Sequence, residues 1–302
     1  MNKFKLTCIA LGLGFSSISA NAVLITDWDY LNDAGFGTDY TSEAGDATGV
    51  TATGATLDQF DPLFSGELPK TLSWGQPYKA VNPNELQSSL AIDDSKTGSV
   101  TTSVVDGVGA LAFSEGTGLT HENWGVTGDT LVSATLFDGL FLAPTAPVSL
   151  PPTAAPALQF QIQFEETYNH PTGGTCEYGG TLDGEVGINQ SGCADLFTII
   201  LDDDVSFTQD GDAIFLSNSF VIPADGLDDY EYTLTTRLLG LTFVENVDCP
   251  EGKTCIGFLT EEDNTNTLEA AFAISAREVT EPGTLAIFGL GLLGLAGLRR
   301  RA

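Results

Sequence analysis

The end of the chain limits the topology of everything that precedes it. Residues 283–298 contain no charged side chain, and Arg299, Arg300 and Arg301 follow directly. A helix of 16 residues rises about 24 Å, slightly less than the ~30 Å hydrocarbon core of a bilayer. The pattern predicts a short transmembrane helix over residues 283–298. Because positive charge stays on the cytoplasmic side, the chain before Glu281 is expected outside the inner membrane.

The residues just before this predicted helix carry a second feature. Glu281 and Pro282 precede an apolar span that glycines interrupt and a cluster of arginines ends. This combination resembles the tails of PEP-CTERM proteins of Gram-negative bacteria, although Thr280 stands where that family has its first proline. The resemblance implies that residues 279–302 are a sorting signal, cut near Glu281 and Pro282 by an exosortase-type enzyme. The alternative is a plain anchor that stays in the inner membrane.

The beginning of the chain is typical of a secretory signal peptide. Two lysines precede a short apolar core, and Ala-Asn-Ala at residues 20–22 supplies the small residues of a cleavage site. We expect the Sec export machinery to take up the chain, and residues 1–22 to be removed between Ala22 and Val23. The two ends together predict an exported domain over residues 23–278, delivered through an inner-membrane intermediate to the cell surface or the extracellular medium.

The charge of this exported part is strongly negative. The chain holds 11 Lys and Arg against 41 Asp and Glu, and five of the basic residues lie in the two terminal signals, which contain no acidic residue except Glu281. Binding to phosphates needs clustered Lys and Arg. The composition therefore excludes nucleic acid as a partner and predicts a soluble, well-solvated surface.

Four cysteines lie beyond the signal peptide, namely Cys176, Cys193, Cys249 and Cys255. An even number in an exported protein predicts disulfides. Of the three pairings that four cysteines allow, proximity in the sequence favours Cys176–Cys193 and Cys249–Cys255. A zinc site is the rival interpretation, but the Cys-x-x-Cys spacing typical of zinc ligands is missing, so no metal ligand is assigned.

Alternation with a period of two dominates the middle of the chain. In residues 158–164, large apolar residues alternate with three glutamines, which is the pattern of a half-buried strand. Other predicted strands are residues 23–30, 100–105, 110–113, 130–141, 195–201, 213–216, 220–222, 230–244 and 270–276. The spacing of these strands predicts an all-β fold, an antiparallel β-sandwich of jelly-roll or immunoglobulin-like type.

Two long loops are also expected. Residues 143–156 contain five prolines and should be extended and poorly able to join a sheet. They form either a loop within one sandwich, which we prefer, or a linker between two halves. Residues 31–58, which are rich in Gly, Thr, Ala and acidic residues, are predicted to be the second loop.

The motif Thr120-His121-Glu122-Asn123 stands out because the chain has only two histidines. With its surroundings it resembles a subgroup of PEP-CTERM proteins defined by a Thr-His-x-Asn motif, and this resemblance covers most of the exported domain. It implies an exported, β-rich surface protein and supplies no catalytic activity. From the residues themselves we expect Thr120 and Asn123 to hydrogen-bond to neighbouring backbone and His121 to cap a strand edge. The supporting segments are residues 28–30, 72–75, 87–90, 164–169, 193–197 and 255–258.

Acidic residues offer further candidates. Glu165 and Glu166 end a predicted strand, so their side chains should face opposite sides of the sheet. Residues 202–204 (three aspartates) and Asp210 with Asp212 offer oxygen ligands for Ca²⁺, although neither set has the EF-hand spacing. Calcium is therefore a candidate ion, and no cofactor is otherwise implied.

These observations favour a non-enzymatic, exported surface or matrix protein, and the family resemblance implies an exopolysaccharide or biofilm setting. We expect Trp28, Trp74 and Trp124 in the core between sheets. Their exposure in one groove would instead indicate a carbohydrate- or calcium-binding module. Two carboxylates that converge in a cleft, one with a raised pKa, would indicate a secreted polysaccharide hydrolase.

Overall fold

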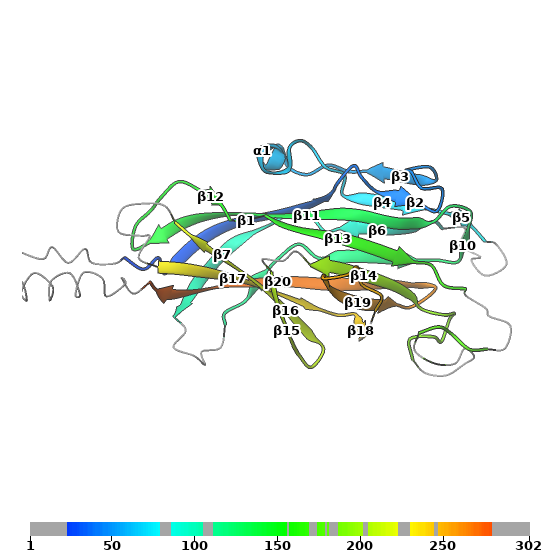
Figure 1. Cartoon of the computed structure of the whole chain (residues 1–302). Helices are drawn as coiled ribbons and strands as arrows, with labels where there is room; N and C mark the ends of the chain where they lie inside the picture. The colour runs from blue at the N-terminus through cyan, green and yellow to red at the C-terminus, as the bar shows by residue number, and fades with distance from the viewer. Residues whose placement is uncertain are drawn as a thin grey trace, which may run out of the picture.

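A computed structural model describes most of the predicted exported domain. The described residues are 23–78, 86–104, 111–155, 157–168, 174–178, 180, 187–201, 205–222, 230–244 and 247–279. They form strands almost throughout, with a single α-helix, α1 (Asp61–Phe64), and a 3-10 turn (Asp58–Phe60) before it. The prediction of an all-β, mainly antiparallel chain is confirmed (Figure 1).

The two terminal signals lie outside the described residues. This applies to the signal peptide up to Ala22, and to the predicted transmembrane helix with its flanking Glu281, Pro282 and arginines. Among the residues that the structure describes, no helix is long and apolar enough to cross a membrane.

One group of strands is antiparallel and is built around β11. In hydrogen-bonded order its members are β18 (Thr242–Val244), β19 (Thr254–Thr260), β14 (Asp195–Leu201), β13 (Leu158–Glu165), β11 (Leu131–Ala146), β1 (Asp27–Phe36) and β7 (Lys96–Val104). The short strands β2 (Thr41–Ser42) and β12 (Thr153–Ala154) also pair with β11. This arrangement ties the start of the described chain to its middle.

A second group of strands is built around β20, which is 15 residues long. Its order is β3 (Val50–Thr53), β4 (Thr71–Trp74), β6 (Ser88–Ile92), β9 (Leu119–Asn123), β20 (Asn264–Glu278), β17 (Tyr230–Leu239), β16 (Ala213–Val221) and β15 (Ser206–Asp210). The two-residue strand β8 (Ser114–Glu115) also pairs with β20, and β5 (Gln76–Pro77) pairs with β10 (Val126–Thr127).

Strand β7 joins the two groups. Its first residues pair antiparallel with β1, whereas residues 102–104 pair parallel with the end of β20. The start of β1 and the end of β20 therefore lie at the same end of the molecule (Figure 1). The segment that leads to the C-terminal tail leaves the domain beside the point where the described chain begins.

The two groups share one hydrophobic core. In β13 the apolar residues Leu158, Phe160, Ile162 and Phe164 are buried and the glutamines between them are exposed, as the alternation predicts. These residues belong to a buried cluster with side chains from both groups, for example Ile256 of β19 in the first group and Trp74 of β4 in the second. The cluster also includes Phe36, Leu72, Leu90, Leu131, Phe197, Ile199, Ile214, Leu216, Phe258 and Leu268.

The segment around α1 covers the outer face of the first group (Figure 1). Phe60, Phe64 and Leu68 form a small cluster with Leu31 of β1 and with Phe137 and Phe141 of β11. The later residues of β1 are therefore buried on both faces. The prediction of a loop over residues 31–58 is wrong for residues 31–36 for this reason, because a strand covered on both sides loses the alternation that identifies a half-buried one. Residues 37–40, 43–49 and 54–57 lie outside strands, as predicted.

The prediction for residues 143–156 is also wrong in part. Strand β11 continues to Ala146, and β12 takes up two further residues of this segment. Pro144 lies opposite Trp28, at a register shift between Asp27 and Trp28. An irregularity of this kind tolerates a residue without an N–H group.

Other strand boundaries differ by a few residues. The first strand begins at Asp27 rather than Val23, and residues 111–113 are not in a strand. The predicted strand over residues 230–244 is two strands, β17 and β18, separated at Gly240, whose φ of 105° suits glycine best.

The disulfide pairing predicted from proximity is confirmed. Cys176 is bonded to Cys193, and Cys249 is bonded to Cys255. The first bond closes two residues before β14 and the second closes within β19, so the two links lie on strands that are neighbours in the sheet. Each is expected to add about 2–3 kcal/mol by restricting the unfolded chain.

Strand β13 provides a direct test of the shared core. We expect Phe160→Ala to lower the free energy of unfolding by about 3–5 kcal/mol, because a buried aromatic ring is replaced by a cavity. The matched control is Gln161→Ala on the exposed face of the same strand, which should change it by less than about 0.5 kcal/mol. Urea denaturation measures both, and equal effects would contradict the assignment of the faces.

Candidate functional site

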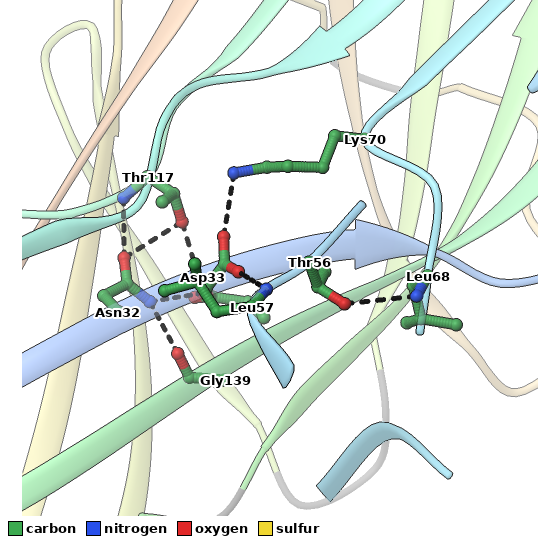
Figure 2. Close-up of polar contacts among 9 residues, drawn as sticks. Asn32, Asp33, Thr56, Leu57, Leu68, Lys70, Thr117 and Gly139 are labelled. Carbon is green, nitrogen blue, oxygen red and sulfur yellow. Dashed lines mark hydrogen bonds and ion pairs between the residues drawn. The ribbon is translucent and has the colours of Figure 1, made fainter. Parts of the chain in front are cut away.

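Two groups of buried polar side chains contain carboxylates of interest, and the first is built around an ion pair on β1 (Figure 2). Lys70 Nζ donates to Asp33 Oδ1 at 2.8 Å, and the backbone N–H of Leu57 donates to Asp33 Oδ2, also at 2.8 Å. Thr56 Oγ1 accepts a hydrogen bond from the backbone N–H of Leu68 nearby. The Asp33 side chain is fully buried, so both of its oxygens have a partner where solvent is excluded.

The neighbouring residue Asn32 extends this network to the opposite face of β1 (Figure 2). Its Nδ2 donates to Asp138 Oδ1 at 2.7 Å and to the carbonyl of Gly139 at 2.8 Å. Its Oδ1 accepts from both the backbone N–H and the hydroxyl of Thr117. The network links β1 and β11 to the segment before β9, and its hydrogen bonds are complete.

Asp138 titrates abnormally within this network. The pKa of its carboxyl is raised to about 7, mainly by loss of solvation and to a smaller extent by the charge of Asp33, while hydrogen bonds from Asn32 and Thr117 act in the opposite direction. Because each group has a partner, the Asn32–Asp33 network is best explained as a structural tie between layers.

The second polar centre consists of three carboxylates. Glu166 follows the last residue of β13, Asp195 is the first residue of β14, and Glu262 lies in the turn between β19 and β20. One oxygen of each lies within 4.8 Å of the others. Asp195 is fully buried and Glu262 is 1% exposed, whereas Glu166 is partly buried. We call these three residues the carboxylate triad.

Strand pairing brings the triad together. Glu165 lies opposite Leu196 in the β13–β14 ladder, which places Glu166 beside Asp195. Asp195 in turn lies opposite Thr260 at the end of β19, two residues before Glu262. The triad therefore gathers where three neighbouring strands begin or end.

The hydrogen bonds of the triad are incomplete. Asp195 Oδ1 accepts from the backbone N–H of Thr167 at 2.7 Å. Asp195 Oδ2 and Glu166 Oε2 are buried and have no hydrogen-bond partner among the described residues. This contrasts with Asp33, whose two oxygens are both satisfied.

Burial and the charges of neighbouring carboxylates raise the pKa values of Asp195 and Glu166. Loss of solvation raises the pKa of Asp195 to about 7, against hydrogen bonds from Thr167 and Asn123. The pKa of Glu166 is raised well above its ordinary value, mainly by loss of solvation and then by the negative charges of Asp195 and Glu262. The indole N–H of Trp74 has the opposite effect and lowers this pKa. Buried like charges at this spacing disfavour ionisation of Asp195 and Glu166.

Asn123 belongs to the same region. It ends β9, its side chain is fully buried, and its Nδ2 donates to the carbonyl of Thr260 at 3.4 Å. Its Oδ1 has no hydrogen-bond partner within the described part of the chain. The expected bond to backbone is present, but the partner lies on a distant strand and not in the adjacent sequence.

The prediction that His121 caps a strand edge is wrong. Strand β9 is paired on both sides, by β6 and β20, and His121 is 2% exposed. Its ring stacks on Trp74 with centroids 5.6 Å apart and meets Phe164 and Phe197 edge-on. Burial lowers the pKa of His121 to about 3, so the imidazole is neutral in this aromatic cluster. Thr120, which precedes it, is partly buried.

The other residues singled out from the sequence differ in burial. Glu165 is exposed and Glu166 turns inward, as expected for consecutive strand residues. Trp28 and Trp74 are fully buried and Trp124 is partly buried. Asp210 and Asp212 are exposed in the turn between β15 and β16, while the aspartates at 202–204 lie outside the described residues.

Sequence reasoning missed Asp195 and Glu262. The burial of Asp195 could have been predicted from the sequence, because this charged residue begins a largely apolar strand. All seven residues of that strand, β14, are buried. No comparable signal exists for Glu262, whose position beside Asp195 depends on strand pairing.

The tail gives the clearest comparison with known proteins. Residues 278–301 match the family model of the PEP-CTERM protein-sorting motif. This motif indicates a protein that is exported, sorted to the surface and processed by an exosortase-type enzyme. The match contains Glu281, Pro282 and Arg299 to Arg301, the residues predicted for sorting. A comparison with curated proteins finds no match.

The buried ion pair can be tested by removing its cation. We expect Lys70→Met to destabilise the fold by about 3–5 kcal/mol, because Asp33 would keep an uncompensated buried charge. The control is Lys96→Met, which breaks the 2.8 Å pair with Glu115, a side chain that is 71% exposed. That change should be worth about 0–1 kcal/mol. Similar losses in both variants would contradict the structural role of the Asn32–Asp33 network.

The raised pKa values predict a specific pH dependence. Between the ordinary aspartate value of 3.8 and about 7, the folded state holds a proton on Asp195 that the unfolded state has lost. This contribution to stability is therefore present at low pH and disappears as pH rises through that window. In the presence of EDTA, Asp195→Asn should gain stability relative to the unchanged chain as pH rises from about 4 to 7. Urea denaturation across this range measures the difference, and a constant difference would contradict the assignment.

Proposed function

We propose that the chain is a non-enzymatic protein of the cell surface or extracellular matrix, associated with an exopolysaccharide or biofilm layer. The observation that carries this proposal is the sorting motif at residues 278–301, which follows a strongly acidic β domain. In this view the tail holds the protein transiently in the inner membrane until an exosortase-type enzyme releases it. The domain itself would be of the Thr-His-x-Asn subgroup.

The shape of the domain supports this proposal. Two groups of strands around one core favour a single antiparallel sandwich, of jelly-roll or immunoglobulin-like type, over residues 23–278. Residues 143–155 support one domain because they extend β11 and supply β12. The start of β1 and the end of β20 lie at one end of the molecule (Figure 1). A tail that leaves from that end keeps the rest of the domain clear of the membrane surface during processing.

The buried residues favour a non-enzymatic role over a polysaccharide hydrolase. The triad has converging carboxylates, and the pKa values of Asp195 and Glu166 are raised, as a hydrolase needs. Asp195 and Glu262, however, are closed off from solvent. A sugar polymer needs an open cleft to reach both groups. His121 is enclosed by aromatic rings, and its two nitrogens have no hydrogen-bond partner among the described residues, so it is not placed as a base.

The tryptophans do not favour a sugar-binding platform. Stacking on a pyranose ring requires an exposed aromatic face, yet Trp28 and Trp74 are at 0% exposure. Both contribute instead to the packing between strands. An association with polysaccharide would therefore be a property of the layer in which the protein resides, without ring stacking by these residues.

The first test is the intact mass of the protein from envelope and supernatant fractions of its native host. We expect a species that begins at Val23 and ends near Glu281. In a strain without the exosortase-type enzyme, the mass should include the tail. Retention of Arg299 to Arg301 in the inner membrane of the unmodified strain would contradict sorting and make the tail a plain anchor. A released species that washes freely from the exopolysaccharide would contradict the matrix role alone.

A further inference from the structure

We propose that Glu166, Asp195, Glu262 and Asn123 form a binding site for a divalent cation, and that Ca²⁺ is the ion that fits it. This inference does not depend on the sorting signal or on the matrix role. It concerns a different place from the exposed aspartates at 210 and 212, which sequence alone suggested for calcium.

The donors have the chemistry and spacing of a calcium site. Three carboxylates and one side-chain amide offer oxygen atoms only, which hard cations such as Ca²⁺ and Mg²⁺ prefer over zinc or copper. Calcium binds oxygen at about 2.3–2.6 Å, so two oxygens on opposite sides of one ion are about 5 Å apart. The triad oxygens lie within 4.8 Å of one another, which allows each to contact the same ion.

Asn123 provides an observation that is independent of the acidic residues. Its side chain is fully buried, lies beside Asp195 and acts on that carboxyl. Because its Nδ2 donates to the carbonyl of Thr260, its Oδ1 is the atom left without a donor in the described structure. A buried amide oxygen in this state costs about 1–3 kcal/mol, and a bound cation would remove that cost.

The charge of the site also calls for a cation. The fold neutralises the buried Asp33 with Lys70 at 2.8 Å, as Figure 2 shows. Among the described residues, no Lys or Arg forms a comparable ion pair with Glu166 or Asp195. Protonation and a bound metal ion would each offset the charges of Glu166 and Asp195. The buried Asn123 Oδ1, which has no hydrogen-bond donor in the described structure, adds a neutral oxygen ligand of the kind that a hard cation accepts.

The position of the site gives the ion a structural effect. Glu166, Asp195 and Glu262 lie at the ends of strands in the first group, and Asn123 ends β9 in the second. An ion held by all four would therefore link the two groups of strands at one point of the core. Exported modules commonly bind calcium with dissociation constants of about 10⁻⁴–10⁻³ M, which suits a site filled only outside the cell.

The experiment uses the full-length chain, stripped of metal with EDTA and then given CaCl₂ or MgCl₂. In 10 mM Ca²⁺, which would be about 10–100 times the dissociation constant, we expect the melting temperature to rise by about 3–10 °C. Tb³⁺, which replaces Ca²⁺, should show emission on excitation of tryptophan, because Trp74 acts on Glu166 and so lies close to the ion.

Matched variants distinguish Ca²⁺ binding at this site from loose Ca²⁺ binding to the acidic surface. Asp195→Asn and Glu262→Gln keep the size of the side chain and remove one charge, so both should lose the Ca²⁺ shift and the Tb³⁺ emission. Asp195→Asn should melt at or above the metal-free temperature of the unchanged chain, since its repulsion with Glu166 is relieved. The control Asp210→Asn removes an exposed charge and should keep the full response.

Three results would overturn the proposal. The first is a melting temperature of the unchanged chain that Ca²⁺ does not alter. The second is an equal shift in Asp195→Asn, which would indicate loose binding to the acidic surface. The third is a response to Mg²⁺ as large as that to Ca²⁺ with no Tb³⁺ emission, which would indicate an effect of ionic strength.

Discussion

The hydrogen bonding of β20 is the constraint on which the rest of the structure depends. Residues 264–268 of β20 pair with β9 and residues 269–278 pair with β17, while residues 274–276 also pair with β7, which in turn pairs with β1. A single strand near the C-terminus thus holds the second group together and connects it to the first. The sorting motif begins at the last residue of β20, so the domain and its sorting signal are contiguous in the chain.

The Asn32–Asp33 network and the carboxylate triad both bury carboxylates, but they differ in how the negative charge is compensated. Asp33 has a lysine and a backbone N–H as partners, so the Asn32–Asp33 network is complete without any added group. In the carboxylate triad, loss of solvation raises the pKa values of Asp195 and Glu166, and Asp195 Oδ2 and Glu166 Oε2 have no hydrogen-bond partner among the described residues. Loss of solvation makes unpaired charge expensive, so a centre of the second kind must hold protons or bind a cation.

Several features could be predicted because their causes are local. The burial of alternate residues in β13 follows from the two-residue period of a strand. The disulfides Cys176–Cys193 and Cys249–Cys255 follow from short loops, and the inward turn of Glu166 follows from its position after Glu165. The course of β1 could not be predicted, because α1 covers its outer face and removes the alternation. Pro144 entered a strand because its partner strand shifts register opposite it.

The sequence alone determined the export and sorting of this protein, since a contiguous run of residues carries that information and its receptors read it in linear form. It also determined the β class, because the apolar period is local. The environment of His121 and the meeting of Glu166, Asp195, Glu262 and Asn123 were decided only by the tertiary structure. These four residues come from separate strands and turns, and only the pairing of β13, β14 and β19 and the packing of β9 bring their oxygens together.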